Sequence, residues 1–499
     1  MKNRSFLLCS IFLVFLPVFF FAQSSILHPT MVKQAVYSDI TPPLRSMHII
    51  QPSKEQPDKE IFNETDLREI RHHQPPPFTL IEDPVWQKEN VSYLPFPSGP
   101  VQNFEGIGNI SGVYPPDTQG DVGPNNYVQV VNLNFEIWNK TGTSLYGPVA
   151  LSTIWQGIPA PWNNTNNGDP VVLYDQAANR WIISQFSLPN SSQYAELVAI
   201  SQTADPTGAW YRYVFQFGTK MPDYPKLGVW PDGYYLSANQ FISDSGWGGV
   251  AACALERSKM LTGDSTARMI YFDLGYASDP SSMLPSDWDG TIAPGANEPN
   301  YFSYFNDWSS LTQQYLKLWE FHVDWDNTAN STFSEGFSLV TAPFNSSLCN
   351  AIRGRCIPQP GTSIQLESLS DRLMFRLQYR NFGTYQTMVT NHTVNVDGSG
   401  HAGIRWYELR NTGSGWTIYQ QGTFAPDSSE RWMGSIAMNS HGDIALGYSV
   451  SDNIATYPTI RYTGRLAGDP LGQMTTGEQT IINGSGSQTG SAARWGITV

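Results

Sequence analysis

The chain has 499 residues, of which 29 are Lys or Arg and 43 are Asp or Glu, so its formal charge at pH 7 is −14. An acidic surplus without any run of basic residues repels phosphate backbones, and we therefore exclude nucleic acid as a partner. The 13% aromatic content, with 42 Gly and 35 Pro, is typical of many short strands joined by tight turns. Composition thus favours an all-β protein.

The beginning of the chain is typical of an export signal. Two basic residues precede an apolar stretch over residues 6–21, and the small residue Ala22 follows it. This order predicts a signal peptide over residues 1–22 and a secreted or cell-surface protein. An uncleaved membrane anchor is the alternative, because the run is close to the shortest that crosses a bilayer. No later segment is apolar for long enough, so we expect no transmembrane segment after cleavage.

The next segment, residues 23–102, mixes Pro, Gln, His and charged residues without a sustained period. This composition predicts an extended or disordered, Pro-rich leader. From residue 103 to residue 499 the sequence has the character of strands and turns throughout. One large domain over 103–499 is the simpler prediction.

A loosely repeated phrase organises this domain: a turn rich in Asp, Gly and Pro, an apolar run, a second turn and a second run. The phrases start near Asp121, Asp169, Asp223, Asn300, Asp371, Arg431 and Arg494. Such hairpins predict a β-propeller, because each small sheet buries its faces only against its neighbours. The spacing predicts six or seven blades, with a pair of β-sandwich domains as the alternative.

The last phrase is incomplete. The residues from Ala493 to Gly496 are similar to those around Trp432, yet only three more follow. A ring that stops in a strand leaves an open edge unless an N-terminal strand closes it. We expect a domain truncated at its last blade.

Several of these phrases resemble an uncharacterised family of exported bacterial proteins. The resemblance rests on residues 115–125 (PPDTQGDVGPN), 223–232 (DYPKLGVWPD), 369–377 (LSDRLMFRL), 401–410 (HAGIRWYELR) and 431–434 (RWMG). It implies a propeller-like fold, often joined in that family to C-terminal adhesion or sorting modules. It implies no catalytic residues.

Acids and arginines at the starts of the predicted inner strands are the candidate catalytic residues: Asp169, Asp223, Arg372, Arg431 and Arg494. In a propeller these starts face the central channel, so side chains far apart in sequence converge there. Arginines would hold a carboxylate or sulfate, and paired acids would serve glycoside hydrolysis, as in sialidase-like enzymes or polysaccharide lyases. The alternative is that the same residues cap turns and fasten blades to one another.

Metal binding has two candidate loops, one within residues 117–125 and one with Asp287 and Asp289 within residues 286–290. Asp117, Asp121 and Asn125 offer alternating oxygen ligands of the kind that calcium prefers. Turn formation explains the same residues, and the pattern lacks the closing Glu of a full calcium loop. We expect that no cofactor is required and that calcium is the one metal to test.

Two further predictions concern side chains in loops. Trp155, Trp247 and Trp308 would stack on sugar rings, although Trp is also a common wedge between blades. Cys349 and Cys356 are close in sequence and would form a disulfide in an oxidising compartment.

Two functions fit these features. The first is an exported binding or adhesion module for glycans or extracellular protein partners, with exposed aromatic residues as its surface. The second is a glycan-active enzyme, a sialidase-like glycoside hydrolase or a polysaccharide lyase, with its site at the channel mouth. Whether the protein is an enzyme therefore stays open at this stage.

Overall fold

The computed structural model describes residues 26–54, 59–60, 82–92, 99–163, 165–242, 246–276, 280–307, 313–349, 354–490 and 493–495. The predicted signal peptide lies outside these ranges. The described chain is almost entirely β, which confirms the predicted class. Its helical pieces are α2 (Arg257–Met260), η1 (Leu44–Ser46), η2 (Leu151–Thr153) and η3 (Thr328–Asn330). None of the helices in these ranges has the length and apolar character that a bilayer crossing needs.

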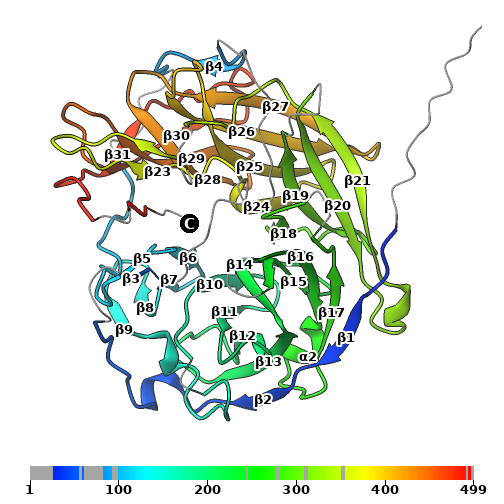
Figure 1. Cartoon of the computed structure of the whole chain (residues 1–499). Helices are drawn as coiled ribbons and strands as arrows, with labels where there is room; N and C mark the ends of the chain where they lie inside the picture. The colour runs from blue at the N-terminus through cyan, green and yellow to red at the C-terminus, as the bar shows by residue number, and fades with distance from the viewer. Residues whose placement is uncertain are drawn as a thin grey trace, which may run out of the picture.

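Four-stranded antiparallel meanders, each made of consecutive strands, stand radially around one axis (Figure 1). The first three are β6 (Gln119–Val122), β7 (Asn126–Val131), β8 (Asn134–Asn139), β9 (Ser144–Ala150); β10 (Val171–Asp175), β11 (Arg180–Ser187), β12 (Tyr194–Ser201), β13 (Trp210–Gly218); and β14 (Lys220–Val229), β15 (Tyr234–Ile242), β16 (Gly246–Leu255), β17 (Arg268–Asp273). The next three are β18 (Leu284–Asp289), β19 (Asn300–Asn306), β20 (Tyr315–His322), β21 (Thr332–Val340); β24 (Met374–Asn381), β25 (Gln386–Asn395), β26 (Ala402–Asn411), β27 (Trp416–Phe424); and β28 (Glu430–Met438), β29 (Ile444–Ser451), β30 (Thr459–Arg465), β31 (Gln479–Ile482).

The first strand of each meander lies nearest the axis, so β6, β10, β14, β18, β24 and β28 form the inner wall (Figure 1). Two of these inner strands, β18 and β24, also pair with each other in parallel and so join their meanders into one nine-stranded sheet. The arrangement is propeller-like, in agreement with the prediction from the repeated phrases, and is not a pair of sandwiches. Two small sheets complete it: β3 (Lys59–Glu60) with β5 (Val113–Tyr114), and β22 (Arg355–Ile357) with β23 (Leu366–Glu367).

The core consists of layers between neighbouring sheets, and strand β12 shows why. Every residue of β12 is buried, because alternate side chains point to opposite faces of the strand and each face meets another sheet. Val198 and Ile200 join the larger apolar cluster on one side, whereas Leu197 and Ala199 join a second cluster on the other. The side chains of β12 are therefore divided between two apolar layers, one on each face of its sheet.

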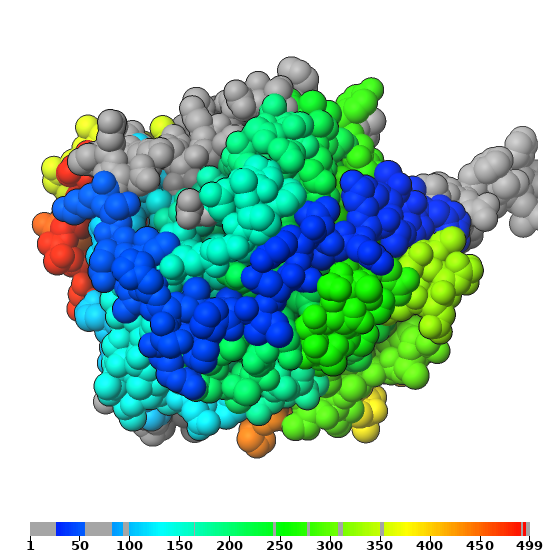
Figure 2. All heavy atoms as spheres, turned by 90° about the horizontal axis from the view of Figure 1, so that it is seen from below, coloured from blue at the N-terminus to red at the C-terminus, as the bar shows by residue number. Residues whose placement is uncertain are grey.

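An N-terminal strap, defined here as residues 26–54, lies along the outside of the molecule (Figure 2). Its strands β1 (Met31–Gln34) and β2 (Tyr37–Ile40) pair with the outermost strands β17 and β13. Farther along the predicted leader, β4 (Trp86–Gln87) pairs with β27. Outer strands have unpaired backbone groups that attract such additions. The described part of the leader is therefore extended and paired at sheet edges.

Candidate functional site

A small hollow lies on the axis at the end where the inner strands begin, and we call it the axial hollow. Its volume is about 40 Å³. Polar and charged residues of its lining are Asp117, Gln119, Asp169, Tyr224, Lys226 and Arg494. Leu369, Met374, Met433 and Trp495 are among its apolar lining residues. Residues from the starts of distant phrases thus meet in one place.

A left-handed backbone conformation recurs along the domain. Seven non-glycine residues near the inner strands or the last phrase take a left-handed φ between 39° and 54°: Asp117, Asp169, Tyr224, Ser282, Leu369, Met433 and Ala493. Residues with a Cβ avoid this region at a cost of about 1–2 kcal/mol each. Backbone conformations of this kind persist only where the surrounding structure imposes them, and they cluster at functional sites.

The central charge of the hollow is the ammonium group of Lys226, which is 5% exposed. Its Nζ donates a hydrogen bond to the carbonyl oxygen of Pro225 at 3.0 Å and lies 3.7 Å from the centre of the Tyr224 ring. Burial lowers the pKa of Lys226, although the nearby carboxylates of Asp169, Asp117 and Asp223 act in the opposite direction. Three acids therefore surround one buried cation.

Asn132 holds two of these acidic residues in place. Its Nδ2 donates to the Asp117 carboxylate at 2.7 Å, and its Oδ1 accepts from the backbone N–H of Asp169 at 2.8 Å. The Asp169 carboxylate accepts in turn from the backbone N–H of Tyr224 at 3.1 Å. Beside them, Oε1 of Gln119 is buried and has no hydrogen-bond partner among the described residues. Buried acceptors without a partner are uncommon in folded proteins.

The three predicted arginines are each bound to an acid of the protein. Arg494 lines the hollow and forms an ion pair with Glu367 at 2.9 Å. Arg372 binds Asp371 through two hydrogen bonds of 2.9 and 3.0 Å, and its guanidinium lies 4.8 Å from the centre of the Tyr224 ring. Bidentate pairing of this kind holds both side chains in one geometry.

Arg431 does not take the place expected of a ligand-binding group. Its side chain is completely buried and binds Asp427 at 2.8 Å and Glu478 at 2.9 Å, and it is not among the residues lining the hollow. The physical reason is that β28 presents Arg431 to a loop and to a neighbouring segment of the last sheet. Arg431 therefore fits the alternative hypothesis, that such charged residues hold parts of the fold together.

The residues of the first predicted calcium loop are divided between strand β6 and the segments on either side of it, and calcium binding stays a prediction. Asp121 lies inside strand β6 and accepts hydrogen bonds from the backbone N–H groups of Val122 and Tyr174, both at 2.7 Å. Asp117 instead lies at the axial hollow, and Asn125 lies in the turn before β7. An extended strand keeps the three apart. No group of three His, Cys, Asp or Glu within the described ranges is placed to hold a metal ion.

A second acidic cluster lies farther along the inner strands. Arg376 binds Asp287 at 2.6 Å and Asp289 at 2.7 Å. Burial raises the pKa of Asp121 to about 7 and that of Asp287 to about 6, and Arg376 opposes both shifts. Since Arg376 bridges the acids of β18 from the adjacent strand β24, this cluster ties inner strands together.

The predicted aromatic ligand surface is wrong at Trp155, which is completely buried in a core cluster. Trp247 is partly buried, packs against the main core and meets the ring of Phe241 edge-on. Trp308 lies outside the described residues. Trp495, which the sequence reasoning did not select, lines the axial hollow; its place in the repeated Arg-Trp phrase was the available signal.

Two further side chains near the site, Glu196 and Cys356, have raised pKa values. Glu196 is 1% exposed, and burial raises its pKa well above the usual value, although the neighbouring Ser184 acts in the opposite direction. Cys356 interacts with Cys349, which raises the pKa of the Cys356 thiol. The disulfide between these two cysteines stays a prediction.

Comparison with known proteins gives no family. No family model matches the chain, and no curated protein matches it. Among solved structures, an endo-arabinase from Bacteroides thetaiotaomicron is 12% identical, covers 61% of this chain and 95% of its own, and has a TM-score of 0.29. A polysaccharide lyase described as a PL25 ulvan lyase is 12% identical, covers 81% and 86%, and has a TM-score of 0.30.

A third solved structure, the exo-β-1,3-galactanase of Phanerochaete chrysosporium, is 8% identical over 74% of this chain and 79% of its own, with a TM-score of 0.26. Scores at this level determine neither the fold nor the activity of the chain. The chain is thus similar in part to these structures and is assigned to no family.

Proposed function

We propose that this protein is a glycoside hydrolase for neutral glycans, with its reaction centre in the axial hollow. The observation that carries the proposal is the placement of Asp117 and Asp169 beside the buried ammonium of Lys226. The two acids lie just before different inner strands, β6 and β10, and are both partly exposed, whereas Lys226 is buried. Carboxylates arranged around one reaction point are what glycoside hydrolysis requires.

The charge of the hollow selects among glycans. Three carboxylates, those of Asp117, Asp169 and Asp223, face one ammonium, that of Lys226. The charges of Arg372 and Arg494 are each paired with an acidic residue of the protein, Asp371 and Glu367. An excess of negative charge repels uronic, sialic and sulfated sugars. We therefore propose neutral glycans as substrates and set the lyase and sialidase-like readings aside.

Lys226 and Asp169 carry the two proton transfers of the proposed hydrolysis. Hydrolysis needs a group that gives a proton to the leaving glycosidic oxygen and a carboxylate that takes one from water. Lys226, whose pKa is lowered by burial, gives the proton. The Asp169 carboxylate takes the proton of the attacking water as the new bond to the anomeric carbon forms. Asp117, fixed by Asn132, stabilises the positive charge that develops on the sugar ring.

The test is hydrolysis of a defined panel. Arabinan, galactan, xylan, mannan and β-glucan are incubated with the protein, and new reducing ends are measured; pectate, alginate and hyaluronan form the acidic arm. We expect products from a neutral glycan only, and about a 10²- to 10⁴-fold loss of kcat in Asp169→Asn and Lys226→Met. Matched controls are Asp205→Asn and Lys140→Met, which change exposed residues. Products from acidic glycans alone would overturn the proposal.

A binding module is the second candidate, and one observation favours it. The hollow, at about 40 Å³, is much smaller than the roughly 300 Å³ or more of typical small-molecule sites. Binding of neutral oligosaccharides without any new reducing ends, abolished by the same two variants, would select the module. Binding and turnover by the wild type, with turnover alone lost in the variants, would select the hydrolase.

The number of blades and the export of the protein are two further proposals. We infer six blades, since six meanders each contribute one inner strand to the axis. We also propose export, on the basis of the signal-like residues 1–22. N-terminal sequencing of the protein recovered outside the producing cell tests this, with a start near residue 23 expected and an intact residue 1 as the contrary result.

A further inference from the structure

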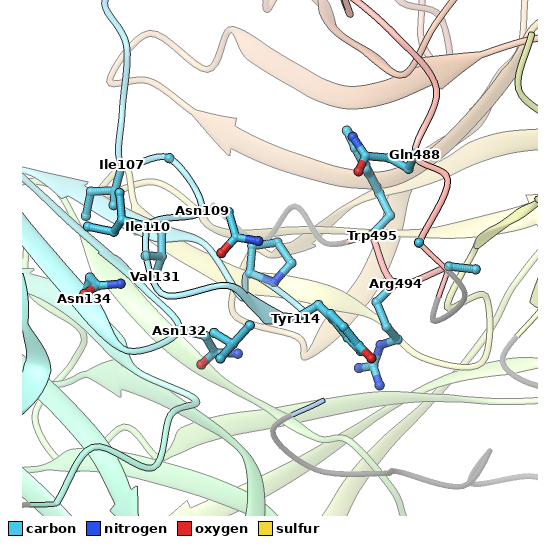
Figure 3. Close-up of a pocket in the computed structure, with 15 residues that line it drawn as sticks. Ile107, Asn109, Ile110, Tyr114, Val131, Asn132, Asn134, Gln488, Arg494 and Trp495 are labelled. Atoms are coloured by element: carbon cyan, nitrogen blue, oxygen red, sulfur yellow. The ribbon is translucent and has the colours of Figure 1, made fainter. Parts of the chain in front are cut away.

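A second cavity, of about 250 Å³, lies where the first and last parts of the described domain meet, and we call it the seam cavity (Figure 3). Ile107, Ile110, Val131 and Asn134 lie on one side, and Gln488 and Trp495 on the other (Figure 3). The cavity is several times larger than the axial hollow. It has the size of a site for one sugar ring rather than for a large ligand.

The lining of the seam cavity is apolar and amide-rich. Among the described residues it contains no Asp, Glu or Lys, and their single formal charge, on Arg494, is paired with Glu367 at 2.9 Å. Amide side chains come from Asn109, Asn132, Asn134 and Gln488. Apolar and aromatic surface with a few convergent polar groups is the composition of sites for uncharged ligands. A metal ion would find no carboxylate in this lining, and a polyanion would find its one cation already paired.

Asn134 supplies the most specific evidence for a ligand. This side chain is 1% exposed, and its Nδ2 donates to the Ser111 hydroxyl at 2.8 Å. Its Oδ1 has no hydrogen-bond partner among the described residues. Leaving such a group unsatisfied costs about 1–3 kcal/mol, which a donor on a ligand would recover. A sugar hydroxyl is a donor, whereas a purely apolar ligand is not.

The seam cavity and the axial hollow are adjacent. Arg494 and Trp495 line both. Asn132 lines the seam cavity, and its Nδ2 holds the Asp117 carboxylate of the hollow at 2.7 Å. A ligand that fills the cavity therefore ends beside the proposed reaction centre.

We propose that the seam cavity is a subsite that binds a neutral sugar unit adjoining the unit held in the axial hollow. This inference rests on the proposed hydrolase function and names where its substrate chain runs. Sugar hydroxyls donate to Asn134 Oδ1, and the partly exposed Trp495 offers an aromatic surface to the ring. Binding energy gained here, away from the bond that breaks, is available to speed the chemical step.

The test is calorimetric titration with neutral oligosaccharides of one to six units. The wild type is titrated if it hydrolyses none of them, and otherwise the Asp169→Asn protein, which is not expected to turn over substrate. The series is prepared from the glycan that the wild type binds or hydrolyses, or from each neutral glycan of the panel if none is hydrolysed. We expect affinity to rise about tenfold when the chain becomes long enough to enter the seam cavity. Adding Asn134→Leu should abolish this increase and leave the affinity of the single sugar unchanged.

Asn126→Leu is the matched control, because Asn126 is a buried asparagine of the same sheet that does not line the cavity. Gln488→Ala, an exposed change, keeps the test informative if both leucine variants unfold. Length-independent affinity, or equal losses in Asn134→Leu and Asn126→Leu, would overturn the subsite. Turnover with length-independent affinity defeats the subsite alone, whereas length-dependent binding without turnover in the wild type defeats the hydrolase alone.

Discussion

Replacing Arg431 by Met tests whether this arginine stabilises the fold or binds a ligand. The Arg431 side chain is completely buried and makes hydrogen bonds of 2.8 and 2.9 Å to Asp427 and of 2.9 and 3.2 Å to Glu478. The Arg431→Met variant keeps much of the side-chain volume and removes the charge. It leaves the Glu478 carboxylate, 8% exposed, with Arg461 as its one remaining cation at 2.7 Å.

The expected loss follows from these contacts. Removing one member of a buried ion pair costs about 3–5 kcal/mol when the other charge is left uncompensated. Because Arg461 still neutralises part of the Glu478 charge, we expect the lower end, a loss of about 3 kcal/mol in the free energy of unfolding. Arg461→Met is the matched control. That arginine is 23% exposed and makes one contact to Glu478, so about 1 kcal/mol is expected.

Urea unfolding followed by tryptophan fluorescence measures both variants, with oligosaccharide binding measured below the transition. Arg431→Met should shift the midpoint to lower urea concentration and leave binding intact. A variant as stable as the wild type would refute the stabilising role of Arg431. A variant that loses binding without losing stability would show that Arg431 contacts the ligand. The assignment of Arg431 as a fastener would then be wrong.

Three further predictions concern buried charges. Asp39→Ala should lower the free energy of unfolding by about 2–3 kcal/mol, because Arg212, 2% exposed, loses its carboxylate partner; unchanged urea unfolding would contradict this. Burial raises the pKa of Asp121 to about 7, above its unfolded value of about 3.9, so its protonated form stabilises the fold at low pH and that contribution is lost as the pH rises from about 4 through 7. The melting temperature of Asp121→Asn should therefore fall less than that of the wild type between pH 5 and pH 8, and equal falls would contradict the assignment. Burial also raises the pKa of Glu196, so Glu196→Gln should match the wild-type melting temperature at pH 5 and exceed it at pH 9, with a lower value at pH 9 as the contrary result.

Much of the architecture is readable in the repeated phrases, because most of them lie at or near the start of an inner strand. The phrase at Asn300 is an exception, since it begins β19, the second strand of its meander. Asp169 and Arg494 start two of the other phrases, and both line the axial hollow. Lys226 escaped notice because it lies within β14, just after a register shift at Asp223, and spacing in the sequence does not reveal such a shift. A buried lysine also has no local signal, since its importance comes from acids contributed by other strands.

Other residues were misjudged because their partners are distant in the sequence. Arg431 meets Glu478 across the last sheet. Trp155 adjoins turn residues, which suggests exposure, yet it lies two residues after the short helical turn η2 and is completely buried in a core cluster. The composition of residues 23–102 indicates a leader, but it cannot reveal that β1 and β2 pair with strands of two separate meanders. Long-range pairing of this kind depends on the assembled sheets.

The strap has a consequence for the order in which the protein folds. Met31 pairs opposite Tyr271, and Ile40 pairs opposite Tyr211, so residues translated early must wait for sheets that are translated much later. Contacts between such distant segments slow folding, because the intervening chain has to be closed into a loop first. The strands of the strap therefore cannot dock until β13 and β17 have been translated. Until they do, the outer edges of β13 and β17 stay open to chaperones, or to the same edges of another nascent chain.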